Sequence, residues 1–263
     1  MITIFDLTSL KKKRPLTCAE SVSKEYVSLA FSPDSKYLMA QGGAPDWLLC
    51  LWTWEKNPPK LIATAKTTNA LMAQVHACSF SLTDNNNIAV VGNGILKQLR
   101  LTESAMKLLQ SPLGQREPEN FVSHAWLSDE RLVVGTDTGG LLVIEGSELK
   151  VALSINTSPP IEGEKNGVAC ICVYSKGFAV GSYDGTLSLF EPTDTGALYH
   201  KNKSFRIESN LAAIRHMSIS PTEVRAPLPT SAPGLGAPRC HICTVNRRTP
   251  PASGTWPTCA RRV

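Results

Sequence analysis

The chain has 263 residues, 42% of them hydrophobic, which suits one large or two small globular domains. No apolar run approaches the roughly 18 residues of a membrane helix, and the first basic residues follow the short N-terminal apolar segment, which excludes a signal peptide. The net charge of +5 comes from residues 224–263, which hold six arginines and no lysine, aspartate or glutamate. Residues 1–223 are nearly neutral and offer no basic face for nucleic acid. We expect a cytosolic protein with reduced cysteines and no membrane partner.

Short antiparallel strands are predicted in chain order, in sets of four. Residues 2–7 read as the third strand of a partial unit, and residues 10–16 read as its turn and fourth strand. Four complete units follow, at about residues 25–66, 71–110, 120–155 and 167–207. The last unit shows the pattern best, because Asp184-Gly185 between alternating segments is a strong hairpin signal. Residues 212–220 then read as the first strand of a fifth unit.

Two sets of landmarks recur at one period. The ends of the predicted first strands are 46 to 49 residues apart, at Phe31, Phe80, Trp126, Val173 and Ile219. Glycines close the second strands at steps of 43 and 46 residues, at Gly92, Gly135 and Gly181. A period in the mid-forties with four short strands per unit is typical of a propeller blade. The sequence therefore predicts an all-β, incomplete β-propeller of about four full blades plus partial blades.

Several segments resemble the WD-repeat family. The Phe-Ser-Pro-Asp segment at residues 31–34 matches the turn between that family's first and second strands. The place of its Trp-Asp signature is taken by Trp52-Thr-Trp54, Arg100-Leu101, Ile144-Glu145 and Phe190-Glu191. No Gly-His pair precedes a blade, so the family's His-Asp-Ser-Trp hydrogen-bond network is not expected here.

Within that family, the segments at residues 133–145 and 174–179 resemble WD-repeat proteins of the axoneme of cilia and flagella. The likeness covers about residues 2 to 223. It implies a non-enzymatic scaffold for axonemal or dynein-arm proteins, in axoneme assembly or inner dynein arm organisation.

The expected domains are a partial propeller at 1–223 and a disordered tail at 224–263. The tail has seven prolines and three glycines without period, a composition that does not support a sheet or a core. We interpret it as a foreign segment, such as an alternative exon, and the chain as a truncated isoform. An open arc would leave strand edges exposed and lower the stability of the domain.

Cysteines and glycines offer candidate sites with simpler explanations. The pair Cys240 and Cys243, with His241 between them and Cys259 beyond, falls short of a zinc site, which usually needs two such pairs. Cys170 and Cys172 share one strand face and are expected to be buried hydrophobes, as are Cys50 and Cys78. The glycine-rich segments at 92–94, 135–140 and 181–185 precede strands rather than helices, so hairpin turns are favoured over phosphate loops.

Other candidates involve charged and aromatic residues. The basic run Lys11–Arg14 is either a nuclear import patch or, as we favour, a solvated loop. Trp47, Trp52 and Trp54 surround one strand, and blade packing is favoured over a partner-binding aromatic patch.

The leading hypothesis is a scaffold that binds other proteins, with no catalytic, cofactor or metal residue assigned. The alternative is a propeller enzyme or small-ligand binder whose site lies in the central channel. Its visible candidates are His76, His124 and His216, all on predicted first strands, where a packed or hydrogen-bonded role is the simpler reading. A third hypothesis is nucleic-acid binding by the arginine tail.

Overall fold

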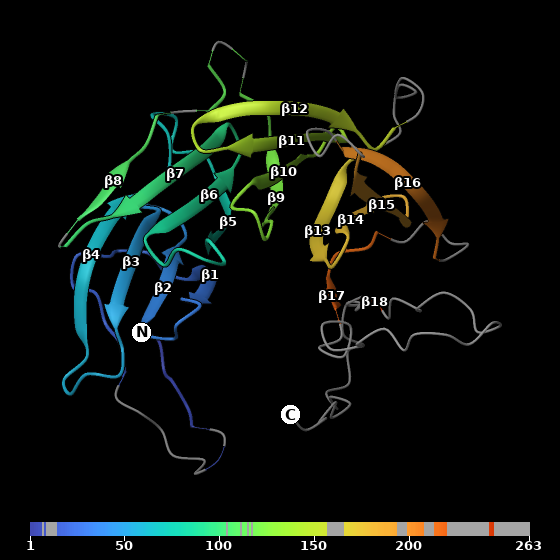
Figure 1. Cartoon of the computed structure of the whole chain (residues 1–263). Coiled ribbons are helices and arrows are strands. Elements are labelled where there is room, and N and C mark those ends of the chain that lie inside the picture. Colours follow the sequence, from blue (N-terminus) through green and yellow to red (C-terminus); the bar gives the residue numbers. More distant parts are fainter. Residues whose placement is uncertain are drawn as a thin grey trace, which may run out of the picture.

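The protein forms four four-stranded antiparallel sheets that follow one another around an arc (Figure 1). The structure is a computed structural model that describes residues 1–6, 8, 15–103, 105–110, 112–114, 116, 118–156, 166–193, 199–207, 213–219 and 242–244. Each sheet has four strands in sequential order, as the repeat pattern predicted. The all-β class and the incomplete propeller architecture are confirmed.

The sheets are here called blades 1 to 4. Blade 1 contains β1 (Tyr26–Phe31), β2 (Tyr37–Gly42), β3 (Leu48–Thr53) and β4 (Lys60–Lys66). Blade 2 contains β5 (Val75–Phe80), β6 (Asn87–Gly92), β7 (Ile95–Leu101) and β8 (Met106–Leu108). Blade 3 contains β9 (Phe121–Trp126), β10 (Leu132–Thr136), β11 (Gly140–Glu145) and β12 (Glu148–Ser154). Blade 4 contains β13 (Val168–Tyr174), β14 (Gly177–Ser182), β15 (Thr186–Pro192) and β16 (Tyr199–Arg206).

The first strand of each blade lies on the inner side of the arc, and the fourth lies outside (Figure 1). Consecutive first strands contact one another, β1 with β5, β5 with β9 and β9 with β13. Phe31, Phe80 and Trp126 are the last residues of β1, β5 and β9, as the landmark spacing predicted. The period in the sequence is therefore the period of the blades.

The core consists of layers between successive sheets, because each strand alternates its side chains between two faces. Between blades 1 and 2, for example, Met39 and Leu51 pack against Val90 and Leu99. Similar layers lie between blades 2 and 3 and between blades 3 and 4. The middle strands β2, β6, β10 and β14 are almost wholly buried, since they have neighbours on both edges and both faces.

Segments from the chain ends lie against the outer blades of the arc. Ile2 and Leu16 exchange two backbone hydrogen bonds of 3.0 and 2.8 Å and pack on the free face of blade 1. This agrees with the predicted N-terminal strand pair, of which residues 7 and 9–14, including Lys11–Arg14, lie outside the described residues. At the other end, β17 (Met217–Ile219) and Ile214 pack on blade 4.

A short strand of the tail lies among the described residues. The sequence predicted no strand after residue 223, but β18 (Ile242–Thr244) pairs antiparallel with β17. Two of its three residues are β-branched, which favours a strand locally even though prolines dominate the segment around it. The rest of the tail, with Cys240, His241 and Cys259, lies outside the described residues.

The glycine-rich segments are hairpin turns, as predicted. They connect β6 to β7, β10 to β11 and β14 to β15, so each leads into a strand. Gly94, Gly139 and Gly185 have φ values of +64°, +91° and +80°, which favour glycine in such turns.

Candidate functional site

The three histidines considered for a channel site are not gathered in one place. His76 on β5 hydrogen-bonds through Nε2 to Asn120 Oδ1 at 2.9 Å. His124 on β9 hydrogen-bonds through Nε2 to Ser79 Oγ at 2.6 Å. Both bonds join blade 2 to blade 3, whereas His216 is exposed just before β17. His76 and His124 thus have the hydrogen-bonded role that was favoured, and His216 is not packed.

His124 is neutral at physiological pH. Burial lowers the pKa of its imidazole to about 4, since a charged ring would lose its hydration between the blades. Its Nδ1 is shielded and has no hydrogen-bond partner among the described residues. These features describe a contact between blades rather than a group that exchanges protons with a substrate.

Three cysteines of the blades are buried, and Cys172 is partly buried. Cys50, Cys78 and Cys170 are at most 8% exposed, and burial raises the pKa of Cys78 and of Cys170 to about 12. Cys170 and Cys172 share one face, as predicted, and belong to the cluster that contains Ile214, but Cys172 is only partly buried, contrary to the expectation. In the described part of the chain, no group of three or more histidine, cysteine or acidic residues is placed to bind a metal.

The tryptophans of blade 1 are packing residues. Trp47 lies in the layer between blades 1 and 2, and Trp52 is buried beneath the N-terminal segment. The indole N–H of Trp52 donates to Thr17 O at 3.3 Å. Trp54 is half-buried on the same face as Trp52, and its ring meets Phe31 edge-on with centroids 5.5 Å apart. Blade packing, the favoured prediction, accounts for Trp47 and Trp52.

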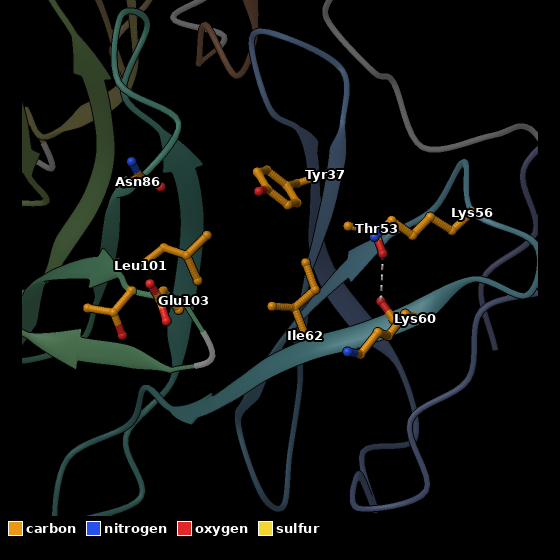
Figure 2. Close-up of a pocket in the computed structure, with 9 residues that line it drawn as sticks. Tyr37, Thr53, Lys56, Lys60, Ile62, Asn86, Leu101 and Glu103 are labelled. Atoms are coloured by element: carbon orange, nitrogen blue, oxygen red, sulfur yellow. Dashed lines mark hydrogen bonds between the residues drawn. The ribbon is translucent and has the colours of Figure 1, made fainter.

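A groove between blades 1 and 2 is the main candidate for a binding site (Figure 2). It encloses about 470 Å³ and lies where turns of both blades meet. Its apolar surface comes from Tyr37 at the start of β2, Ile62 on β4 and Leu101 at the end of β7. The tyrosine ring and the isoleucine face Leu101 across the gap in Figure 2. The remaining lining residues are polar: Thr53, Lys56, Lys60, Asn86, Thr102 and Glu103.

The two lysines that line the groove differ from the basic residues around it in having no ion pair among the described residues. Outside it, Lys36 pairs with Asp34 at 3.0 Å, and Arg100 pairs with Asp84 at 3.3 Å. Lys56 and Lys60, on the blade 1 side, are exposed. No ion pair to either lysine is found in the described residues, whereas five ion pairs occur elsewhere. The groove therefore combines an apolar surface with two lysines that have no ion pair among the described residues, and with one carboxylate, Glu103.

The sequence did not point to this groove. Its lining comes from segments spread between residues 37 and 103, and none of them contains a recognisable motif. The period of the repeats could have placed these residues in the turns between strands. Only the tertiary structure shows which turns of adjacent blades face each other.

Comparisons with known proteins support the fold and the relationship. The chain is 31% identical over 248 residues to mouse cilia- and flagella-associated protein 57, covering 80% of this chain and 20% of the relative. It is 29% identical over 188 residues to cilia- and flagella-associated protein 57 A of Tetrahymena thermophila, covering 68% of this chain and 14% of the relative. The resemblance to WD-repeat proteins of cilia and flagella is confirmed, and these relatives are named cilia- and flagella-associated protein 57.

A solved structure agrees with the architecture. The β-propeller domain of Myceliophteria thermophila Cps50 (Swd1) superimposes with a TM-score of 0.63 at 16% sequence identity, covering 84% of this chain and 70% of that one. At that identity the match shows the fold alone. No protein-family profile matches the chain.

The length of the chain relative to its relatives and the lack of a membrane-spanning helix in the described residues both bear on function. The chain spans about a fifth of the length of the first relative, so the activity of the whole relative does not transfer directly. In the described residues, no helix has the length and apolarity needed to cross a bilayer.

Proposed function

We propose that this chain is a non-enzymatic scaffold that binds other proteins in cilia or flagella. The observation that carries the proposal is the arc of four blades in a chain whose relatives are named cilia- and flagella-associated proteins. A propeller presents turns on a rigid frame, and binding through such turns requires no reactive residue. The finer role we propose is in the assembly of the axoneme or in the organisation of inner dynein arms.

No observation on the described residues favours the alternative of a channel enzyme or ligand binder. Its candidate histidines serve blade contacts or lie apart from one another.

The proposal is tested in ciliated cells that express the full chain with a small tag. We expect the tagged chain to remain with axonemes after detergent extraction of isolated cilia, and proximity labelling to mark axonemal or dynein-arm proteins. A tagged chain confined to the cell body, or fully released by detergent, would overturn it.

A further inference from the structure

The space between blades 1 and 2 remains open because blade 2 turns back at once after β7. Thr102 donates from both its backbone N and its Oγ1 to Ala105 O, at 2.8 and 2.9 Å, which closes a tight turn. No long loop of blade 2 therefore covers Ile62 and Tyr37. On the blade 1 side, the connection between β3 and β4 is longer and carries Lys56 at the rim.

The apolar part of the groove consists of Tyr37, Ile62 and Leu101. Leu101 is buried beneath it, while Tyr37 and Ile62 are half-buried at its sides and belong to the edge of the core layer between the blades. Burial of an added apolar side chain between these three would remove their remaining exposed surface from water, which favours binding.

The charged part of the groove selects the kind of partner. Lys56 and Lys60 lie on the same side, next to the turn that joins β3 to β4, and Glu103 lies on the opposite side (Figure 2). The nearby Lys36 and Arg100 have carboxylate partners, whereas Lys56 and Lys60 have no ion pair among the described residues and are available to a ligand. Two exposed lysines on one side of an apolar surface complement a segment that combines carboxylates with an apolar side chain.

We propose that this groove docks a short acidic segment of a partner protein. One apolar side chain of the segment sits between Tyr37, Ile62 and Leu101, and its carboxylates pair with Lys56 and Lys60. This inference rests on the proposed scaffold function, which it deepens by naming the docking site and the chemistry of the partner.

A random twelve-residue peptide library displayed on phage, selected on the full chain, tests the proposal. The enriched peptides should combine aspartate or glutamate with a bulky apolar residue. As synthetic fluorescent peptides, they should bind the double variant Lys56→Glu, Lys60→Glu about tenfold or more weakly than the unaltered chain. Their affinity should also fall as salt rises, since the lysines are exposed.

The matched control carries the same charge change away from the groove, as Lys66→Glu with Lys203→Glu, and should bind the peptides as the unaltered chain does. Thermal melting of both variants shows that each is folded. The proposal is overturned if no acidic peptides are enriched, or if the enriched peptides bind the groove variant and the control equally well.

The groove variant also separates this inference from the broader function. If the unaltered chain stays with detergent-extracted axonemes but peptide binding does not depend on the two lysines, the scaffold stands and the groove proposal fails. If the chain does not stay with axonemes, the scaffold proposal fails whatever the peptides show.

Discussion

Small residues at the ends of second strands set how closely the blades approach. A Cβ atom added to Gly135 would lie 2.5 Å from Val168 Cγ1, and one added to Gly181 would lie 2.7 Å from Ile214 Cγ2. In both cases the neighbour begins the next unit of the arc. A Cβ atom at the corresponding Gly42 and Gly92 would also be crowded, but by Ser23 and by the Gln74–Val75 backbone, which begin the same blade.

Replacement of Gly135 by alanine should destabilise the protein by about 1–3 kcal/mol, because the added methyl overpacks the contact with Val168. Chemical denaturation of the full chain measures the change. In the double variant with Val168→Ala, the loss should be smaller than the sum of the two single losses, since the smaller side chain makes room for the methyl. Additive losses would show that the contact is not the cause.

Polar contacts between inner strands depend on single side chains as well. Ser79 hydrogen-bonds to His124 across blades 2 and 3, and Ile171 N donates to Ser123 Oγ across blades 3 and 4 at 3.1 Å. These residues connect the blades on the inner side of the arc in a chain without the family's Gly-His signature.

His124 should make stability depend on pH. Its pKa of about 4 in the folded protein lies below the ordinary value near 6.5, so the unfolded chain takes up the proton first as the pH falls. The stabilisation that the neutral His124 gives to the folded protein is fully present above pH 6.5. It is lost as the pH falls from 6.5 to 4, and a further fall in pH causes no further loss. Between pH 7 and pH 5, the unfolding free energy should fall by about 1–2 kcal/mol more in the unaltered chain than in His124→Gln. Equal slopes for the two proteins would contradict this prediction.

At the scale of elements, the hairpin between β14 and β15 shows how a turn supports a blade. The Asp184 carboxylate accepts hydrogen bonds from Ser182 Oγ and from Thr186 N and Oγ1, the last two at 3.0 Å. Burial opposes ionisation of Asp184, but these hydrogen bonds outweigh it, so its pKa is lowered. The turn is therefore held by the ionised carboxylate.

Substitution Asp184→Ala should lower the unfolding free energy by about 1–3 kcal/mol, since Thr186 Oγ1 loses its acceptor and Ser182 Oγ and Thr186 N each lose one of two acceptors. Asp184→Asn keeps one acceptor oxygen and should cost less. Thermal or urea unfolding at neutral pH ranks the two variants. If asparagine proved as damaging as alanine, the hydrogen bonds would not explain the effect.

At the scale of the molecule, the two outer blades of the arc have faces that other blades do not cover in the described structure. On blade 1, Leu29 and Phe31 are 54% and 50% exposed, although Ile2 and Leu16 cover part of the same face. Phe205 on β16 is similarly exposed at the other end of the arc. Exposed apolar side chains on a sheet face favour association with another surface.

Self-association of the chain should depend on this face of blade 1. Light scattering after size-exclusion chromatography should show the unaltered chain associating as its concentration rises, and Leu29→Ser with Phe31→Ser should shift it toward a monomer. The two side chains are half-exposed, so the variant should remain folded with little loss of stability. A monomer at all concentrations in the unaltered chain, or equal association in both, would contradict the prediction.

Much of the fold was predictable from the sequence because its information is local and repeated. Alternating apolar residues, the Asp184-Gly185 turn and the period of Phe31, Phe80 and Trp126 determined the strands, their order and the four blades. Strand pairing within a blade joins segments that are close in the sequence, so short-range signals suffice. The short strand β18 was missed, because three residues carry too little periodicity to stand out in a proline-rich segment.

The groove and the contacts between blades were decided only by the tertiary structure. Tyr37 and Leu101 lie 64 positions apart in the sequence, and their approach depends on how two complete sheets pack face to face. The same packing places His124 against Ser79, and it brings Lys56 and Lys60 to the groove without an ion pair to any described residue. The local sequence thus determined the blades, whereas the packing of one blade on the next decided which side chains meet between them.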